Sequence, residues 1–456
     1  ADVAGSLPKA LVEEGHEACV VVPLYVNTIK QQWRDQMTYV TNFSVPVGWR
    51  NQYCGLFTSK INNVTYYFLD NEYYFKRDFG LYGYYDDAER YAFFSRAVLE
   101  MLKVIDFKPQ IINSNDWQCA LIPVYYSIFY RNDEKLWGIK NVFTIHNIQY
   151  QGRYGMEILE DVLGIPKHFA SLMEYDRDIN LMKAAIEVAD KVTTVSPTYS
   201  KEILDPWFSH GLDRALSDKQ YKTCGFLNGI DTDMYNPATD PSIPANFTVS
   251  KKAGKKICTQ KLLEEVGLPQ GDEPVLGMVS RLVEHKGFDL VKCVFDDIIN
   301  LGYKVVILGS GEAQYEQFFH EMRWKYPDRV AFTCGYIPDL AKKIYAGANM
   351  FLMPSKSEPC GLAQMISLRY GTIPIVRKTG GLADSIVDCG DENGTGYTFQ
   401  SYNAHDMFYA VKRAKDCYWN KTEWNKLVTR AMKADFSWKQ SAKLYIGLYK
   451  ELVGEQ

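Results

Sequence analysis

The sequence has no closely spaced cysteine pair of the C-x-x-C type, although it contains 10 cysteines in 456 residues. They stand singly at Cys19, Cys54, Cys119, Cys224, Cys258, Cys293, Cys334, Cys360, Cys389 and Cys417. This spacing indicates neither a zinc knuckle nor a disulfide scaffold. Reduced thiols, as in a cytosol or a plastid stroma, are therefore expected.

Long apolar runs and an excess of charge are also missing. The longest apolar run covers residues 18–26, well below the roughly 20 residues that a membrane-spanning helix needs. The net charge is −4, which gives no reason to expect nucleic acid or an anionic membrane as a partner. The first residue is Ala1 and no signal peptide is visible, so we expect a start that is processed, engineered or truncated.

What the sequence does have is length and many aromatic side chains. A chain of 456 residues is too long for one ordinary core and predicts two domains of about 200 residues each. Aromatic residues make up 14%, which a large core with interfacial tyrosines would explain, but an aromatic face also packs well on the C–H face of a hexose. The best candidate for such a sugar contact is the cluster Tyr73-Tyr74-Phe75, Tyr82 and Tyr84-Tyr85.

Strand-like and helix-like segments alternate in the first half of the chain. Short apolar runs typical of buried parallel strands occur at residues 18–23, 65–69, 111–112, 142–145 and 192–195. Helical patterns cover residues 3–15, 88–105 and 180–188. Alternation of this kind predicts a doubly wound parallel sheet.

A second alternating series fills the other half, with strand-like runs at residues 275–279, 305–308, 330–333, 350–353 and 373–376. The proline-rich stretch 236–244 is typical of a connection between domains. We therefore predict an α/β protein with a first domain over 1–231, a linker and start of the second domain over 232–272, a second domain over 273–436 and a final helix over 437–456. Such sheets bind ligands beyond the carboxyl ends of their strands, so the expected site is a cleft between the domains.

Polar residues follow several predicted strands of the second half. Arg281 comes directly after a strand and Lys286 opens the next helix. Two cations there favour a multiply charged anion such as a pyrophosphate, although a solvated loop with helix-surface charges is the plain alternative. The glycine-rich turn over residues 309–311 follows a strand too, but it is more typical of a structural turn.

Glu358 and a glycine pair follow the next two strands. Glu358 could bond sugar hydroxyls or stabilise positive charge on a reacting anomeric carbon, or it could only complement a helix dipole. The backbone amides of Cys360, Gly361 and Leu362 could bind hydroxyl or phosphate oxygens. The stretch Thr379-Gly380-Gly381 either forms a tight turn or lets the backbone approach a ligand closely.

In the first half, His146 and Asp116 each follow a predicted strand closely, and Asn228 lies at the end of this half. A lone histidine is more often structural than catalytic. Its place at a strand end that faces the expected cleft favours a role in the site.

Taken together these stretches resemble bacterial glycogen synthases and plant starch synthases over essentially the whole chain. The resemblance is carried by residues 5–11, Asp116-Trp117, His146, residues 189–199, Asn228-Gly229-Ile230-Asp231, residues 280–287, residues 344–348, Glu358-Pro359-Cys360-Gly361-Leu362 and Lys378-Thr379-Gly380-Gly381-Leu382. It implies a GT-B fold, in which two Rossmann-like domains face a central cleft and the last helix crosses back to the first domain. The first domain would be the acceptor side and the second would bind the nucleotide sugar.

The implied activity is transfer of glucose from ADP-glucose to the non-reducing end of an α-1,4-glucan, with retention at the anomeric centre. No metal and no cofactor are implied, because Arg281 and Lys286 would neutralise the departing diphosphate. Retention without a well-placed second carboxylate favours front-face attack over a double displacement through Glu358.

The resemblance also assigns roles residue by residue. Glu358 matches the essential carboxylate beside the transferred glucose, and His146 matches a histidine close to that sugar. Asp116 and Asn228 match polar residues that line the cleft, and Tyr336 matches an aromatic ring that stacks on the adenine. The backbone donors to phosphate and sugar would be Cys360, Gly361, Leu362, Thr379, Gly380 and Gly381.

The sequence departs from the family's pattern at its front. The family has a first strand and a Lys-x-Gly-Gly-Leu loop before the helix that opens here at Ala1, and Asp2 matches the acidic residue after that loop. The resemblance therefore implies a gap in the first sheet and fewer contacts to the donor phosphates. We expect the chain as given to be poorly active for this reason.

Three alternatives are kept open by the sequence. One is a relative that uses UDP-glucose, such as a sucrose synthase. A phosphorylase would need a lysine that carries pyridoxal phosphate and a much longer chain. A glucan-binding paralogue without activity is the third, and the presence of Glu358, Arg281, Lys286 and His146 argues against it.

Overall fold

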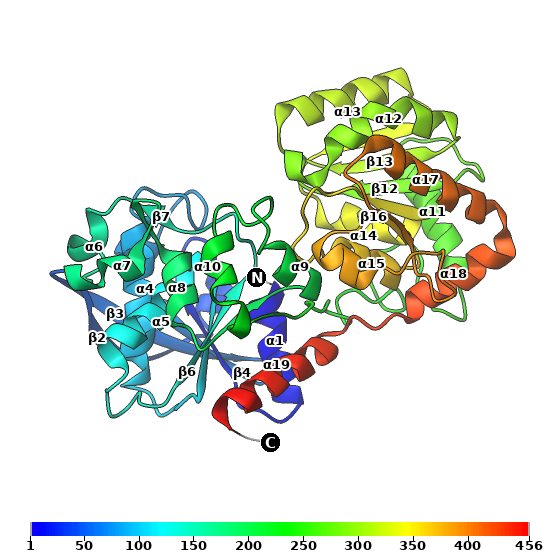
Figure 1. Cartoon of the computed structure of the whole chain (residues 1–456). Coiled ribbons are helices and arrows are strands. Elements are labelled where there is room, and N and C mark those ends of the chain that lie inside the picture. Colours follow the sequence, from blue (N-terminus) through cyan, green and yellow to red (C-terminus); the bar gives the residue numbers. More distant parts are fainter. Residues whose placement is uncertain (1, 455–456) are drawn as a thin grey trace. The chain divides into compact units, whose positions relative to one another are not determined.

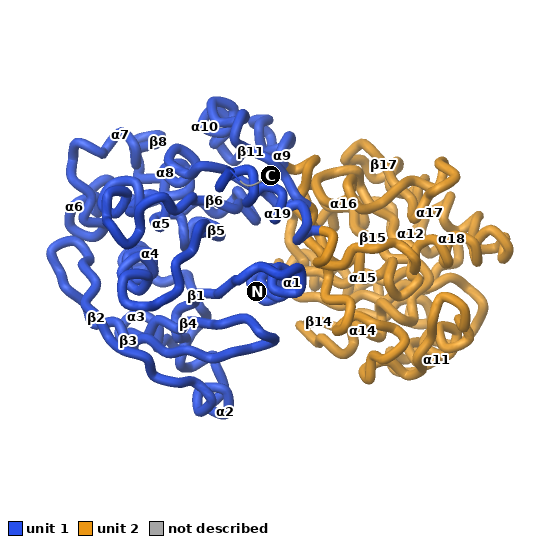
Figure 2. Tube along the Cα trace, turned by 90° about the horizontal axis from the view of Figure 1, so that it is seen from below, with its two compact units in different colours: residues 1–195, 200–226, 441–456 blue, residues 196–199, 227–440 orange. Residues whose placement is uncertain are grey.

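The computed structural model describes residues 2–454, which form two compact units (Figure 2). Unit 1 comprises the chain up to Val195, Ser200–Phe226 and the residues from Ser441 on. Unit 2 comprises Ser196–Tyr199 and Leu227–Gln440. The chain therefore passes from one unit to the other at four places.

Unit 2 is built on one six-stranded parallel sheet in the order β14-β13-β12-β15-β16-β17. Its strands are β12 (Val275–Val279), β13 (Lys304–Gly309), β14 (Val330–Cys334), β15 (Met350–Met353), β16 (Ile373–Arg377) and β17 (Tyr397–Phe399). The five strands predicted for this half are confirmed, and β17 was not predicted. Most of their residues are buried, as expected of a parallel sheet covered on both faces.

Helices lie on both faces of this sheet (Figure 1). They are α11 (Ala253–Glu265), α12 (Phe288–Asn300), α13 (Ala313–Lys325), α14 (Pro338–Gly347), α15 (Ala363–Arg369), α16 (Gly380–Ser385), α17 (Ala404–Trp419) and α18 (Lys421–Lys433). Helix α11 packs against α14, and α12 packs against α17. The stretch 232–272 belongs to this unit and carries α11.

One buried lysine ties α11 to the sheet. Lys255 Nζ donates hydrogen bonds to the carbonyl oxygens of Ala346 and Tyr370 and to the Thr372 hydroxyl, at 2.8–3.0 Å. Burial lowers the pKa of Lys255 to about 7, while the three acceptors match the three donors of its ammonium form. This polar anchor explains how a helix with weak amphipathic patterning can be held in place.

Unit 1 holds two four-stranded sheets and a small third one. The first sheet runs in the order β1 (Cys19–Pro23), β4 (Val64–Asp70), β3 (Arg50–Ile61) and β2 (Thr38–Val47), with only the β1–β4 pair parallel. The second is parallel, in the order β11 (Thr223–Gly225), β10 (Lys191–Thr194), β6 (Lys140–Ile145) and β5 (Ile111–Asn115). The third contains β7 (Arg153–Tyr154), β9 (Asp178–Asn180) and β8 (Glu174–Tyr175).

The predicted strands of the first half are confirmed as β1, β4, β5, β6 and β10. The long hairpin β2–β3 was not predicted, because its strands are largely exposed and lack the apolar run of a buried parallel strand. Its pairing comes from antiparallel contact with β4. The first unit is therefore more mixed in strand direction than the sequence suggested.

The helices of unit 1 include the three that were predicted. Those three are α1 (Asp2–Glu13), α4 (Asp87–Leu102) and α8 (Leu181–Val188). Shorter helices are α2 (Gln31–Arg34), α3 (Glu72–Phe75), α5 (Leu121–Tyr125), α6 (Ile158–Asp161), α7 (Ala170–Met173) and α10 (Asp213–Ser217). Two helices span a boundary between the units, namely α9 (Pro197–Glu202) and α19 (Trp438–Val453).

A cavity of about 630 Å³ lies between the two larger sheets of unit 1. All residues of β1 and β5 line it, together with side chains from α1, α4 and α19. The side of β1 away from β4 and the side of β5 away from β6 pair with no other strand in the described part of the chain.

None of the helices within residues 2–454 combines the length and the apolar character that crossing a membrane would require.

Replacing Lys255 tests the polar anchor under α11. We expect Lys255→Met to lower the free energy of unfolding by about 2 kcal/mol, because two buried carbonyls and a hydroxyl lose their donor. The matched control is Lys256→Met, since Lys256 is the exposed neighbour on the same helix and should change stability by less than about 0.5 kcal/mol. Urea unfolding measures both, and equal effects would contradict the anchor.

Candidate active site

The residues singled out in the sequence are divided between the two units. Unit 1 carries Asp2, Asp116 and His146. Unit 2 carries Asn228, Arg281, Lys286, Tyr336, Glu358, Cys360, Gly361, Leu362, Thr379, Gly380 and Gly381. Asp2 is exposed in the first turn of α1.

Several candidates of unit 2 follow the two neighbouring strands between which the strand order of its parallel sheet switches. Strands β12 and β15 are neighbours, and the chain winds outward from them to opposite edges of the sheet. The carboxyl ends of such a strand pair form the crevice in which doubly wound sheets bind ligands. Arg281 and Lys286 follow β12, and Glu358 follows β15.

Lys286 and Glu358 form a buried ion pair at this point. Lys286 Nζ lies 2.9 Å from Glu358 Oε1 and 2.7 Å from Oε2. Ser355 donates a further hydrogen bond to Oε2 at 3.0 Å. The Glu358 side chain is 8% exposed and that of Lys286 is 18% exposed. Each carboxylate oxygen thus accepts at least one hydrogen bond, as a buried carboxylate requires.

Backbone contacts hold the two turns against each other. Gly287 has φ +79°, and a Cβ there would lie 2.0 Å from Pro354 O, so only glycine fits. The Lys356 amide donates to His285 O at 2.8 Å. Arg377, the last residue of β16, donates from Nη1 to Lys356 O at 2.8 Å. The position of the ion pair follows from these contacts.

Two further candidates of unit 2 are open to solvent. Arg281 is exposed, and its guanidinium makes no hydrogen bond or ion pair with the residues that the structure describes. Tyr336 is 90% exposed, in the loop between β14 and α14. A free cation and a free ring are both available to a ligand.

Gly380 and Gly381 let the start of α16 pack directly against the turn that carries Glu358. A Cβ at Gly380 would lie 2.0 Å from Glu358 O, and one at Gly381 would lie 2.0 Å from Cys360 O. The Gly381 amide donates to the carbonyl oxygens of Glu358 and Pro359 at 3.1 and 3.2 Å. The sequence led us to expect that this amide is free for a ligand, and that expectation is wrong for Gly381, because the protein itself uses the donor.

Cys360 and Asn228 meet below this turn. Burial raises the pKa of the Cys360 thiol to about 12, and Asn228 directs its backbone and side-chain amides at the sulfur. The thiol is therefore neutral and is not a nucleophile. The side-chain oxygen of Asn228 is buried and accepts no hydrogen bond from the described residues.

In unit 1, Asp116 has an unusual backbone. Its φ is +58° and its ψ is −179°, a region that is essentially restricted to glycine. The Asp116 amide donates to Thr144 O at 2.9 Å, and its carboxylate accepts from the His146 amide at 2.8 Å. These bonds link the end of β5 to the end of β6 and offset the strain.

His146 is held as a neutral imidazole. Asn115 Nδ2 donates to Asn113 O, so its Oδ1 faces His146 Nε2 at 2.9 Å. Nε2 therefore carries a proton, and Nδ1 makes no hydrogen bond with the residues that the structure describes. Burial lowers the pKa of His146 below its usual value, against the opposing charge of Asp116.

The aromatic cluster divides into core and surface. Tyr74 and Phe75 are buried, which overturns their part in a sugar-contacting surface. Tyr73, Tyr82 and Tyr85 are exposed, Tyr85 to 94%.

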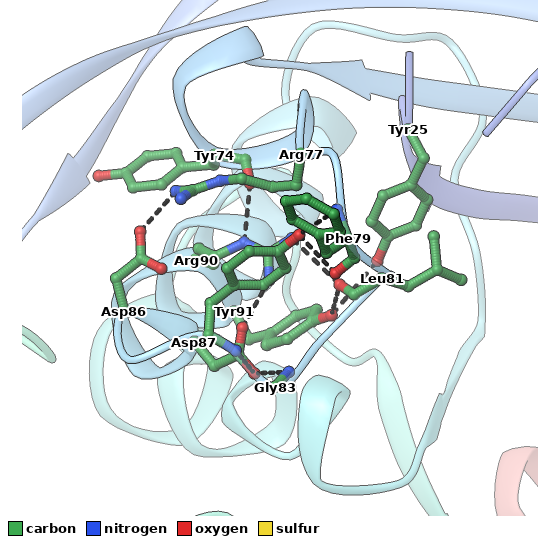
Figure 3. A network of polar contacts seen from close by, with 11 residues as sticks. Tyr25, Tyr74, Arg77, Phe79, Leu81, Gly83, Asp86, Asp87, Arg90 and Tyr91 are labelled. Atoms are coloured by element: carbon green, nitrogen blue, oxygen red, sulfur yellow. Dashed lines mark hydrogen bonds and ion pairs between the residues drawn. The ribbon is translucent and has the colours of Figure 1, made fainter. Parts of the chain in front are cut away.

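The exposed rings belong to or flank the loop between α3 and α4. A buried arginine organises this loop through the network of polar contacts in Figure 3. Arg90 is fully buried and donates to the carbonyl oxygens of Tyr74 and Leu81 at 2.7 and 3.1 Å. It also pairs with Asp87, whose other oxygen accepts from the Gly83 amide. The loop therefore presents its rings from a fixed backbone.

Three residues that hold the candidate site received no role from the sequence: Ser355, Arg377 and Asn115. Each lies at or just after the carboxyl end of a strand, which was the signal available. Among the described residues, no group of three or more histidine, cysteine or acidic side chains is arranged to hold a metal ion.

Two family descriptions match the chain. The starch synthase catalytic domain matches residues 1–218, and the glycosyl transferases of group 1 match residues 260–428. Among curated relatives, a glycogen synthase of Anoxybacillus flavithermus is 46% identical over 99% of this chain and 94% of its own length. A glycogen synthase of Desulforamulus reducens is 47% identical over 99% of this chain and 95% of its own length.

Solved structures agree with these matches. The catalytic domain of starch synthase IV from Arabidopsis thaliana, bound to ADP and acarbose, has a TM-score of 0.90 at 33% identity, covering 100% of this chain and 96% of that one. A sucrose-phosphate synthase from Thermosynechococcus elongatus has a TM-score of 0.58 at 16% identity, covering 98% of this chain and 92% of that one. At this identity the second likeness shows the fold alone.

The strained backbone at Asp116 can be tested with two variants that lose the same carboxylate. We expect Asp116→Gly to be more stable than Asp116→Ala by about 1 kcal/mol, because only glycine adopts this φ and ψ without strain. Urea unfolding of the two variants measures the difference. Asp116→Ala as stable as Asp116→Gly would show that the backbone is not strained.

Proposed function

The chain belongs to the family of bacterial glycogen synthases and plant starch synthases and is a glucosyltransferase of the GT-B fold, and we propose how its residues carry out the transfer. Glucose passes from ADP-glucose to the non-reducing end of an α-1,4-glucan with retention at the anomeric carbon. The relatives named glycogen synthase match over nearly their whole length, and the starch synthase IV structure contains ADP. The expected family, fold and enzyme class are thereby confirmed.

The observation that carries the assignment of roles is the Lys286–Glu358 pair at the crevice of the unit 2 sheet. We propose that Arg281 and Lys286 bind the diphosphate of the donor. Two of the three ammonium protons of Lys286 face Glu358, which leaves one for a phosphate oxygen. Arg281 adds an unpaired guanidinium, which suits bidentate binding of a phosphate.

We propose that Glu358 stabilises the positive charge that develops on the anomeric carbon. Both of its oxygens accept hydrogen bonds, which makes the carboxylate a weak nucleophile and supports front-face attack. In that step the bond from C1 to the diphosphate oxygen breaks and the bond from C1 to the acceptor oxygen forms. The acceptor's proton passes to the departing diphosphate, and ADP leaves.

The remaining roles are proposed from position and chemistry. The exposed ring of Tyr336 stacks on the adenine. The amides of Gly361 and Leu362 bind donor oxygens, since neither donates a hydrogen bond within residues 2–454. Neutral His146 contributes a hydrogen bond to the transferred sugar, while Asn115 orients its ring and Asp116 holds its backbone amide.

Other candidate residues shape the donor site in this proposal. Thr379 is buried at the start of α16, and Gly380 allows that helix to approach the Glu358 turn. Cys360 and Asn228 form the floor below the turn.

We propose that the glucan acceptor also rests on the exposed rings of Tyr82 and Tyr85. A hexose stacks on an aromatic face through its C–H groups. The Arg90 network holds the loop before any sugar binds, which reduces the entropy lost on binding. All ten cysteines are free of disulfide bonds, in keeping with a proposed location in a cytoplasm or plastid stroma.

Glu358→Gln tests the catalytic assignment. With ADP-glucose and glycogen as substrates, we expect kcat to fall by about 10²- to 10³-fold, because the developing charge loses its carboxylate. The matched control is Glu284→Gln, an exposed acid, which should keep kcat within about twofold. Glucose incorporation measures both. A variant Glu358→Gln as active as the parent, or a parent that prefers UDP-glucose, would contradict the proposal.

Tyr85→Ala and Tyr82→Ala test the glucan contact. We expect each to raise KM for glycogen by about five- to tenfold, because a stacking contact is worth about 1 kcal/mol. KM for ADP-glucose should not change. Tyr221→Ala is the control, since Tyr221 is 79% exposed on the same unit. An equal effect of Tyr221→Ala on glycogen binding would rule out a specific platform.

A further inference from the structure

One buried side chain holds the turn that carries the two unused amides. Gln364, in the first turn of α15, is completely buried. Its Nε2 donates to the carbonyl oxygens of Cys360 and Gly361, at 3.0 Å each. The two carbonyls of the turn therefore point toward the glutamine side chain.

The direction of these carbonyls decides the direction of the next two amides. In a trans peptide unit the C=O and the following N–H lie in one plane and point in opposite directions. Turning Cys360 O toward Gln364 therefore turns the Gly361 N–H away from it. In the same way, holding Gly361 O turns the Leu362 N–H away. No cis peptide occurs among the described residues.

The same side chain ties this turn to α16. Gln364 Nε2 also lies 3.0 Å from Ser385 Oγ, so one of its two protons is shared between this oxygen and a carbonyl oxygen of the turn. The Ser385 hydroxyl itself donates to Gly381 O. The Gly381 amide in turn donates to the carbonyl oxygens of Glu358 and Pro359. The side-chain amide of Gln364 thus contacts both the Glu358 turn and the helix that begins with the glycine pair.

The side-chain oxygen of Gln364 has no partner among the described residues, so only the donating Nε2 serves this turn. Gln364 Oε1 is buried and accepts no hydrogen bond from the described residues. A buried acceptor without a partner costs roughly 1–3 kcal/mol. A methionine of similar length would avoid this cost but would offer no donor to Cys360 O and Gly361 O.

We propose that Gln364 is a positioning residue for the sugar-diphosphate part of the donor. It acts by aiming the amides of Gly361 and Leu362 at the oxygens of that group, and it does not touch the donor itself. This inference rests on the proposed function, because it takes ADP-glucose as the ligand of these amides.

Gln364→Met tests the inference in the full chain, with binding of ADP-glucose and of AMP measured by titration calorimetry. AMP has neither the β-phosphate nor the glucose. We expect the affinity for ADP-glucose to fall by tenfold or more, because two hydrogen bonds to the donor lose their alignment. The affinity for AMP should change by less than twofold, and KM for glycogen should stay unchanged.

Two further variants separate positioning from general damage. Gln317→Met replaces an exposed glutamine of α13 and should leave both affinities unchanged. Ser385→Ala removes the link between Gln364 and α16 and the hydroxyl's bond to Gly381 O, but leaves both turn carbonyls bound to Gln364, and should keep ADP-glucose affinity within about threefold of the parent.

The outcomes are distinguishable. Equal loss of ADP-glucose and AMP affinity, no loss of either, or failure of Gln364→Met to fold would each overturn the positioning role. In the last case the residue would serve the fold alone. A parent chain that binds no ADP-glucose and transfers no glucose would instead overturn the proposed function.

Discussion

The buried carboxylate of Glu358 is the constraint on which the donor side of this protein depends. An ionised carboxylate can be taken out of water only if it is paired and hydrogen-bonded, and here Lys286 and Ser355 supply those bonds. For Lys286 to reach Glu358, the turns after β12 and β15 must touch, which requires a glycine at 287. A pair of this kind contributes little net stability. The main effect of the ion pair is to fix the positions of Lys286 and Glu358 at the carboxyl ends of β12 and β15.

A second layer of contacts stands behind this pair. The glycines at 380 and 381 let α16 lie directly on the Glu358 turn, and Gln364 connects both. Polar bonds also hold a turn in unit 1. Asp116 has a strained backbone there, and its hydrogen bonds link the ends of β5 and β6. The reactive groups are thus carried by turns, and buried polar bonds hold these turns in place. Small changes in the size of these supporting side chains should be felt at the site.

Much of the fold could be predicted, and the failures have physical reasons. The strands around residues 275–279 and 350–353 were predicted because buried parallel strands are continuous apolar runs. The hairpin β2–β3 was missed because an exposed antiparallel strand has no such run. Tyr74 and Phe75 were grouped with exposed rings, since sequence spacing does not tell which ring of a cluster turns inward. Gln364 was missed because a single glutamine in a helix carries no pattern.

By itself the sequence determined the alternation of strands and helices, the family, and the charged residues at the strand ends. These features depend only on local composition and on the spacing of residues along the chain. Only the tertiary structure decided which of these groups are free. It showed that the Gly381 amide is used by the protein, that the Arg281 guanidinium is unpaired among the described residues, and that Lys286 and Glu358 hold each other. The reason is that hydrogen bonds between turns far apart in the chain depend on backbone directions, which no local pattern records.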